Sequence, residues 1–190
     1  MKLVILDRDG TINADSDEFI KTPEEWQPLP GALEAIARLN HAGWHVAVAS
    51  NQSGLGRGLF DVVSLNAIHA KMHKAVAALG GRIDAVFYCP HSPDEGCQCR
   101  KPLPGLFEQI GERFGVDLKG VHTAGDSPRD LQAGVAVGCQ PHLVLTGKAE
   151  GLRGQPLPET YPAGTTVHQD LSAFADWLIA RPAAAPRPAA

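Results

Sequence analysis

The feature that most constrains the fold is the start of the chain, where an apolar run leads directly into two carboxylates. Residues 2–6 read Lys-Leu-Val-Ile-Leu, and Asp7, Asp9 and Gly10 follow at once. A run of this length is typical of a buried strand, and in an open α/β sheet ligands bind beyond the carboxyl ends of the strands. We therefore expect Asp7 and Asp9 side by side at a sheet edge. There one carboxylate can attack or hold a metal, while the other, with a raised pKa, moves protons.

The Asp-x-Asp-Gly pattern has two other interpretations, a solvated turn and a calcium loop. Counted from Asp7, Glu18 stands at the twelfth position, where a calcium-binding helix-loop-helix places its bidentate carboxylate. Such a loop follows a helix, however, and here an apolar strand precedes Asp7. The preceding strand argues against calcium.

Composition predicts one globular domain. The 190 residues, 44% hydrophobic and 20% charged, suffice for a single domain with a sizeable core, which we place at residues 1–180. The segment 181–190 contains only Ala, Pro and Arg, and is expected to be a disordered tail.

Charge and hydropathy limit the kinds of binding partner and the cellular location that we expect. The sequence has no signal-peptide pattern and no apolar run near the roughly 18 residues that a membrane span needs, so a cytoplasmic location without a membrane partner is expected. The formal net charge of −4 argues against a nucleic-acid surface. We expect a monomer that binds a small molecule.

Strand-like and helix-like segments alternate along the chain. Apolar runs predict strands, and residues with helical spacing predict helices between them. This alternation indicates a Rossmann-like three-layer α/β/α fold with a mainly parallel sheet. The predicted strands are 2–6, 44–49, 83–88, 121–124 and 143–145, and the predicted helices are 31–42, 61–79, 104–114, 127–137 and 171–180.

Polar residues follow four of these strands. Right-handed connections bring the carboxyl ends of parallel strands to one edge, and turn chemistry alone does not explain four polar ends in order. In sequence they are Asp7 with Asp9, Ser50 with Asn51, the Cys-rich loop ending in Arg100 and Lys101, and Asp126 with Asp130.

These side chains suit phosphoryl transfer. The oxygens of Asp7, Asp9 and Asp126 would hold a hard cation, for which Mg²⁺ is the usual choice beside phosphate. Lys101 and Ser50 can neutralise and hydrogen-bond the other phosphoryl oxygens. Asp7 is then free to attack phosphorus and form an aspartyl phosphate. Asp9 would protonate the leaving oxygen and later deprotonate water.

The set resembles the four ordered motifs of the haloacid dehalogenase superfamily. The resemblance covers residues 3–145 and rests on Asp7-Arg8-Asp9-Gly10-Thr11, Ser50-Asn51-Gln52, Lys101 and Gly125-Asp126-x-x-x-Asp130. It implies a phosphatase with Asp7 as nucleophile and Asp9 as acid and base. It also implies that Mg²⁺ is bound by the Asp7 side chain, the Asp9 backbone carbonyl and the Asp126 side chain, with Asp130 behind them orienting Lys101. Arg8 is expected to point away from the metal.

Four side chains in the Cys-rich loop suit zinc. Cys89, His91, Cys97 and Cys99 offer three thiols and an imidazole, which can close a tetrahedral structural Zn²⁺ site. In a reducing cytosol this clustering favours a metal over disulfides; unliganded thiols with a surface histidine are the alternative. A structural ion would hold the loop that carries Arg100 and Lys101. The remaining Cys139 is expected to be a buried small hydrophobe.

The zinc loop joined to Arg100-Lys101-Pro102 resembles two sister groups of small phosphatases. One removes the 7-phosphate from D-glycero-D-manno-heptose 1,7-bisphosphate, in the synthesis of nucleotide-activated heptose for lipopolysaccharide, and the other hydrolyses histidinol phosphate. Ser53, where the histidinol group tends to have an acidic residue, favours the heptose group. The segment Asp17 to Phe19, in place of a Gly-Tyr pair frequent in that group, departs from it.

Substrate contacts are expected from residues around the two motifs. Arg57 and Arg100 suit a distal phosphate or sugar hydroxyls, because arginine binds phosphate with two hydrogen bonds. The expected substrate-binding set is Asn51, Gln52, Ser53, Arg57, Arg100 and Lys101.

The gaps after the first motif and after the third strand are too short for a large cap domain, so the site should be open. An open site also admits a phosphorylated nucleic-acid end, against which the net charge argues. A zinc-stabilised binding module without activity is the contrasting class, and the intact Asp7 and Asp9 pair argues against it. Six scattered histidines are expected to have no chemical role: His41, His45, His69, His73, His122 and His142.

Overall fold

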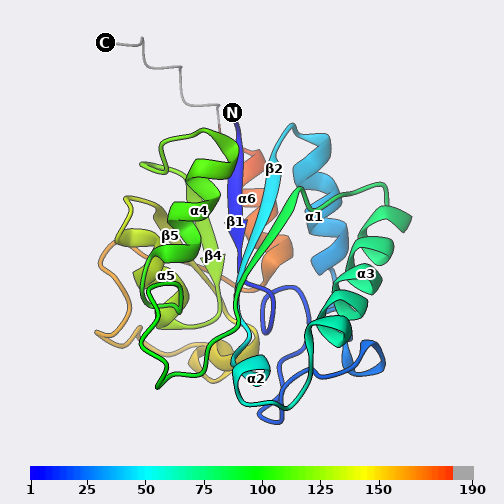
Figure 1. Cartoon of the computed structure of the whole chain (residues 1–190). Coiled ribbons are helices and arrows are strands. Elements are labelled where there is room, and N and C mark those ends of the chain that lie inside the picture. Colours follow the sequence, from blue (N-terminus) through cyan, green and yellow to red (C-terminus); the bar gives the residue numbers. More distant parts are fainter. Residues whose placement is uncertain (182–190) are drawn as a thin grey trace.

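The computed structural model describes residues 1–181 and shows a six-stranded sheet in the order β3-β2-β1-β4-β5-β6 (Figure 1). Every pair of neighbouring strands is parallel, which confirms the predicted α/β class. The strands are β1 (Leu3–Leu6), β2 (His45–Asn51), β3 (Ala85–Cys89), β4 (His122–Gly125), β5 (Gln140–Val144) and β6 (Thr166–His168). Of the predicted tail, residues 182–190 lie outside the described part of the chain.

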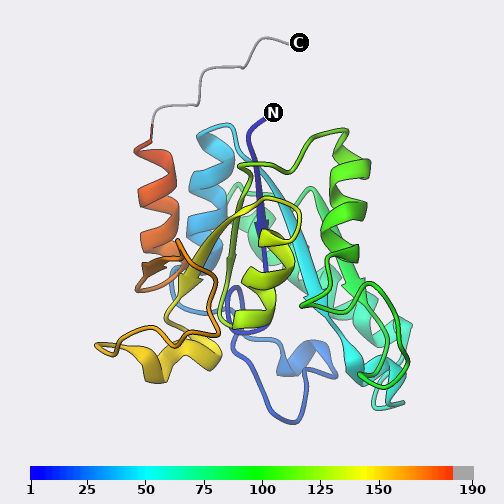
Figure 2. The ribbon, with the colours of Figure 1, turned by 90° about the vertical axis from the view of Figure 1, so that its left-hand side faces the viewer.

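Helices cover both faces of the sheet, as Figure 2 shows edge-on. Three of them pack with the side chains of Val4, Leu6, Val46 and Val48 in the larger core cluster: α1 (Ala32–His41), α3 (Val62–Ala78) and α6 (Leu171–Ile179). The opposite face, formed by Leu3, Ile5, Ala47 and Ala49, is covered by α4 (Gly105–Phe114) and α5 (Pro128–Val135). Because both faces of the central strand β1 are buried, its sequence is a continuous apolar run.

Several short helices and one strand were not predicted from the sequence. Within residues 1–181 the structure adds β6, the four-residue helix α2 (Ser53–Gly56) and two 3₁₀ helices, η1 (Pro23–Glu25) and η2 (Gly147–Leu152). Strand β5 begins at Gln140 rather than 143, because Pro141 and His142 are buried in the sheet although their residue types do not favour a strand.

The connections beyond the carboxyl ends of the strands contain no large domain in the part of the chain described. The segment between β1 and α1 holds only η1, and its Asn13 forms isolated bridges to Asp9 and Pro28. None of the helices in residues 1–181 has the length and apolar character that a membrane crossing requires.

The strand order determines where in the fold the candidate site lies. The chain moves outward from β1 through β2 to β3, then returns to β4 on the other side of β1. The crevice beyond the carboxyl ends of β1 and β4 is the position where doubly wound sheets bind ligands. Asp7 follows β1 and Asp126 follows β4, so the two carboxylates flank this crevice.

Candidate active site

A cavity of about 230 Å³ opens at this crevice, and most of the predicted residues line it. The predicted lining residues are Asp7, Asp9, Asn51, Gln52, Ser53, Arg57, Arg100, Lys101, Asp126 and Asp130. Ser50 is buried behind them, and its hydroxyl accepts a hydrogen bond from Gln52 Nε2 at 2.7 Å. Seven further lining residues stand outside the predicted site set. Four come from the segment between β1 and α1, two lie within the Asp126 motif and one lies in η2: Asp15, Ser16, Phe19, Ile20, Ser127, Arg129 and Lys148.

Lys101 is the buried cation at the centre of the site. Its side chain is 2% exposed, and its Nζ lies 2.8 Å from Asp7 Oδ1 and 2.7 Å from Asp130 Oδ1. The ammonium also donates to the Ala49 carbonyl at 2.6 Å. Burial lowers the pKa of Lys101, but the charges of Asp130 and Asp7 outweigh that effect and raise it. Lys101 is therefore held charged against the predicted nucleophile.

Asp130 is fixed by the helix that carries it. Ser127 and Asp130 form a capping box at the start of α5, with Pro128 in the first turn. Asp130 Oδ2 accepts from the Ser127 N–H at 3.1 Å and from the Ser127 hydroxyl at 2.9 Å, which leaves Oδ1 for Lys101. Helix capping thus sets the direction of this carboxylate.

The carboxylate cluster is short of positive charge. One oxygen each of Asp7, Asp126 and Asp130 lies within 4.8 Å of the others, and Lys101 is paired with Asp7 and Asp130. Burial, followed by the charge of Asp130, raises the pKa of Asp7 to about 7. Burial and the charges of Asp7 and Asp130 raise the pKa of Asp126 to about 9. A divalent cation would relieve this repulsion, and oxygen ligands of this type suit Mg²⁺.

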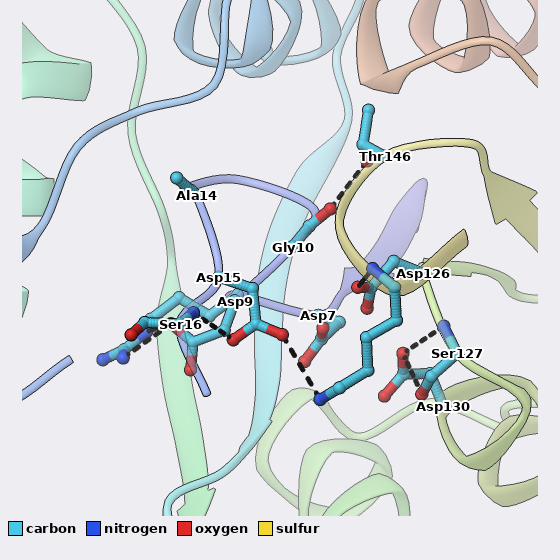
Figure 3. A network of polar contacts seen from close by, with 12 residues as sticks. Asp7, Asp9, Gly10, Ala14, Asp15, Ser16, Asp126, Ser127, Asp130 and Thr146 are labelled. Carbon is cyan, nitrogen blue, oxygen red and sulfur yellow. Dashed lines mark hydrogen bonds and ion pairs between the residues drawn. The ribbon is translucent and has the colours of Figure 1, made fainter. Parts of the chain in front are cut away.

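The loop after β5 holds Asp126 in place, as Figure 3 shows. The Lys148 N–H donates to Asp126 Oδ2 at 2.8 Å, and the Thr146 hydroxyl donates to the Gly10 carbonyl at 2.6 Å. Gly10 and Gly147 have φ angles of 86° and 53°, and a Cβ on either would overlap the Asp126 carboxylate. Glycine at both positions is therefore required for this close approach.

Asp9 is held differently from Asp7. Its Oδ1 accepts from Arg8 Nη2 at 2.8 Å and from Asn13 Nδ2 at 2.9 Å, and its Oδ2 accepts from Gln52 Nε2 at 2.9 Å. Burial raises the pKa of Asp9, but the Arg8 charge and these hydrogen bonds outweigh it and lower the pKa. The expectation of a raised pKa on the proton-moving carboxylate is wrong for the free protein, since the sequence did not show that Arg8 turns back onto Asp9.

Asn51 and Gln52 make more contacts with the protein than the sequence suggested. Asn51 Nδ2 donates to the Lys101 carbonyl at 3.1 Å, and the Lys101 N–H donates to Asn51 Oδ1 at 3.0 Å. Gln52 Nε2 bridges Asp9 and Ser50. Both residues line the cavity, but their amide groups already hold catalytic candidates in position.

Three arginines face the outer part of the cavity. Arg100 Nη1 is buried without a hydrogen-bond partner. Arg57, Arg100 and Arg129 all line the cavity. Burial lowers the pKa of Arg100, and the charges of Arg129 and Arg57 lower it further. The Arg57 guanidinium stands 5.8 Å from the centre of the Phe19 ring, and Phe19 has a φ of 66°, unusual for a non-glycine residue. Phe19, in the segment where the sequence departs from the Gly-Tyr pair frequent in the heptose group, therefore lines the cavity.

The predicted zinc ligands come together as a second cluster. The Cys89 and Cys97 sulfurs are 3.6 Å apart, and His91 Nδ1 lies 3.5 Å from the Cys89 sulfur and 3.3 Å from that of Cys99. A tetrahedral ion with Zn–S bonds of about 2.3 Å spaces its sulfurs about 3.8 Å apart, so the four side chains fit one Zn²⁺. Burial raises the pKa of the Cys97 thiol, but hydrogen bonds with the Arg100 backbone and with the Cys89 and Cys99 side chains outweigh it and lower the pKa to about 7.

The sheet order, the Asp-x-Asp pair after its first strand and the buried lysine define a hydrolase of the haloacid dehalogenase type. Two family models match the chain, HAD-hydrolase-like over residues 98–173 and polynucleotide kinase 3 phosphatase over residues 2–127. Among solved structures, the chain resembles D,D-heptose 1,7-bisphosphate phosphatase from Bordetella bronchiseptica in complex with magnesium and phosphate. That structure is 58% identical, covers 94% of this chain and 98% of its own, and has a TM-score of 0.88.

Curated relatives have the same activity in their names as the solved structure. D-glycero-beta-D-manno-heptose-1,7-bisphosphate 7-phosphatases from B. bronchiseptica and Pseudomonas aeruginosa are 58% and 55% identical. The first match covers 94% of this chain and 98% of the relative, and the second covers 93% and 97%. The chain belongs to the family of D-glycero-D-manno-heptose 1,7-bisphosphate 7-phosphatases.

Proposed function

We propose that the protein is a Mg²⁺-dependent phosphatase that removes the 7-phosphate from D-glycero-D-manno-heptose 1,7-bisphosphate, within the supply of nucleotide-activated heptose for lipopolysaccharide. The observation that carries the chemistry is the Asp7 carboxylate, 2.8 Å from the buried Lys101 ammonium and clustered with Asp126. The relatives' names supply the substrate.

Mg²⁺ would be held by the side chains of Asp7 and Asp126 and by the Asp9 backbone carbonyl. Asp130 is occupied by Ser127 and Lys101 and would stay behind these ligands. When bound, the ion neutralises the carboxylates and the transferring phosphoryl group.

Asp7 and Asp9 divide the two chemical steps. An Asp7 oxygen bonds to phosphorus while the bond from phosphorus to the sugar oxygen breaks, and the Asp9 carboxyl proton passes to that oxygen. Asp9, now ionised, then takes a proton from water as the water oxygen bonds to phosphorus and the Asp7–phosphorus bond breaks. Lys101 and Ser50 hold the phosphoryl oxygens that do not react.

The lowered pKa of Asp9 in the free protein is compatible with this role. A bound phosphate places negative charge beside Asp9, and a neighbouring like charge raises the pKa of a carboxyl group. Substrate binding would therefore favour the protonated Asp9 that the first step needs.

The arginines favour a bisphosphate over histidinol phosphate. Arg57, Arg100 and Arg129 form a positive group without an ion-pair partner in residues 1–181, and Arg100 Nη1 is buried unpaired. A distal phosphate would pair with these guanidiniums. The amine of histidinol phosphate is a cation, which they would repel.

We propose a structural Zn²⁺ at Cys89, His91, Cys97 and Cys99, a monomeric protein and a cytoplasmic location. The convergence of these four ligand atoms supports the zinc. The Gln52 N–H donates to the Cys89 carbonyl at 2.8 Å, which joins the zinc loop to the active site. All four cysteines are free thiols, which suits a reducing compartment.

The experiment is to measure phosphate release with Mg²⁺ from heptose 1,7-bisphosphate and from histidinol phosphate in parallel, and to identify the remaining sugar phosphate by ³¹P NMR. The proposal predicts a strong preference for the bisphosphate, with heptose 1-phosphate as product. A preference for histidinol phosphate, or loss of the 1-phosphate, would overturn it.

A further inference from the structure

A buried histidine on α3 lies behind the acid and base of the proposed mechanism. His69 is 8% exposed, and its Nε2 lies 3.0 Å from Arg8 Nη1. Arg8 in turn donates from Nε and Nη2 to Asp9 Oδ1, at 3.0 Å and 2.8 Å. These contacts form a continuous chain from helix α3 through Arg8 to Asp9.

Arg8 is fully buried and has few alternatives to these partners. Its side chain is 0% exposed, and Asp9 is the carboxylate with which it pairs. A buried guanidinium needs a partner for each of its donor edges, since an unpaired buried charge is costly. The edge at Nη1 is met by His69, which therefore limits how the guanidinium can rotate around Asp9.

The His69 ring is suited to accept from a cation. Burial, followed by the charge of Arg8, lowers the pKa of His69 to about 4. At neutral pH the ring is uncharged, so Nε2 accepts from Arg8 and the ring proton lies on Nδ1. The Tyr88 ring, 6.2 Å away between centroids, packs on the same imidazole and helps to fix it.

We infer that His69 is a positioning residue that acts through Arg8 to aim the Asp9 carboxyl group at the leaving oxygen. The inference rests on the proposed function, because it assigns Asp9 the proton transfer. It gives a positioning role to His69, which was predicted to have no chemical role, and it gives Arg8, which pairs with Asp9, a function.

Leaving-group dependence separates this role from a merely structural one. A sugar oxygen needs a proton as it departs, whereas p-nitrophenolate departs without one, so a misplaced Asp9 affects the first substrate far more. The ratio kcat/KM reports the steps up to departure of the leaving group, which isolates the acid role from the later attack of water.

His69→Leu removes the acceptor, and His69→Gln restores one, because the Gln carbonyl oxygen can accept from Arg8 Nη1. For His69→Leu we expect kcat/KM on heptose 1,7-bisphosphate to fall about tenfold, with kcat/KM on p-nitrophenyl phosphate within about twofold of wild type. His69→Gln should recover most of the loss. The control is His73→Leu, an exposed position one turn further along α3, which should change neither rate.

Equal losses on both substrates, or no loss in His69→Leu, would overturn the inference. If His69→Leu does not fold, His69→Ala, which also removes the acceptor, takes its place: a loss confined to the bisphosphate supports positioning, and an equal loss on both substrates or no loss contradicts it. Failure of the proposed function would appear separately, as wild-type protein inactive on the bisphosphate. Glycerol phosphate would then serve as the substrate with a poor leaving group.

Discussion

Asn51 holds the main chain of Lys101 from both sides. Its Nδ2 donates to the Lys101 carbonyl and its Oδ1 accepts from the Lys101 N–H, at 3.1 Å and 3.0 Å. The pair joins the end of β2 to the end of the zinc loop, 50 residues further along the chain. The position of the Lys101 ammonium against Asp7 therefore depends on a side chain of the neighbouring strand.

Asn51→Ala should lower kcat about 10- to 100-fold with little change in KM, because a displacement of about 1 Å at a catalytic group costs this much. Asn51→Asp, which keeps the acceptor and loses the donor, should fall between Ala and wild type. Steady-state kinetics on the bisphosphate check this. A raised KM with unchanged kcat would instead support the original expectation that Asn51 binds substrate.

Gly147→Ala should weaken Mg²⁺ binding and stability together, since a Cβ there would displace Asp126 or Gly10. The matched control is Gly154→Ala, whose φ of 71° is similarly left-handed but whose Cβ would meet open space. The control should lose about 1–2 kcal/mol of stability from its backbone alone and keep its Mg²⁺ affinity. Isothermal titration with Mg²⁺ and urea unfolding give the two readouts; equal effects in both variants would contradict the placement.

The order of five strands and their helices could be predicted from sequence, because these strands contain short apolar runs, and four of the runs lead into the polar residues of the site. The pairing of side chains within the site could not be predicted from the sequence. Nothing in the spacing indicates that Arg8 would turn onto Asp9, and this turn reversed the expected direction of the Asp9 pKa. Similarly, Arg129 enters the cavity only because the Ser127 capping box sets the start of α5.

A row of hydrogen-bonded histidines also could not be predicted from the sequence. His122 Nδ1 lies 2.9 Å from His142 Nε2, and His142 Nδ1 lies 3.0 Å from His168 Nε2, across β4, β5 and β6. Sequence patterns show polar residues within these strands, but a polar residue inside a strand is identified as buried only when its partner on the next strand is known.

This row should make stability fall in acid. Burial lowers the pKa of His142 to about 3 and that of His168 to about 4, from 6.5. Below pH 6.5 the unfolded chain gains protons that the folded protein does not, so stability falls as the pH drops from about 6.5 towards 4. The loss is about 1.4 kcal/mol per pH unit for each histidine.

Urea unfolding between pH 7.5 and 5 of wild type and of the double variant His142→Leu/His168→Leu tests this. The contribution of the active-site carboxylates is common to both proteins, so the difference in free energy of unfolding isolates the histidines. As the pH falls, the free energy of unfolding of the wild type should decrease relative to that of the double variant. A difference between the two proteins that does not change with pH would contradict the account.

Loss of zinc should lower stability and activity while the carboxylate cluster remains. Cys97→Ser, or a zinc-selective chelator, is expected to lower the Tm and kcat, because the zinc loop leads into Arg100 and Lys101. Cys139→Ala changes a buried thiol outside the cluster and should have little effect on either. Zinc-free protein with full stability would show that the thiols have no structural metal.

The central claim is that Asp7 forms the bond to phosphorus. In a single turnover with Mg²⁺ and heptose 1,7-bisphosphate, stopped by acid and digested, the wild-type protein should carry one phosphoryl group on the peptide that contains Asp7. Asp7→Asn should carry none and release no phosphate. Phosphate release by Asp7→Asn, or a phosphoryl group found on another residue of the wild type, would contradict the mechanism.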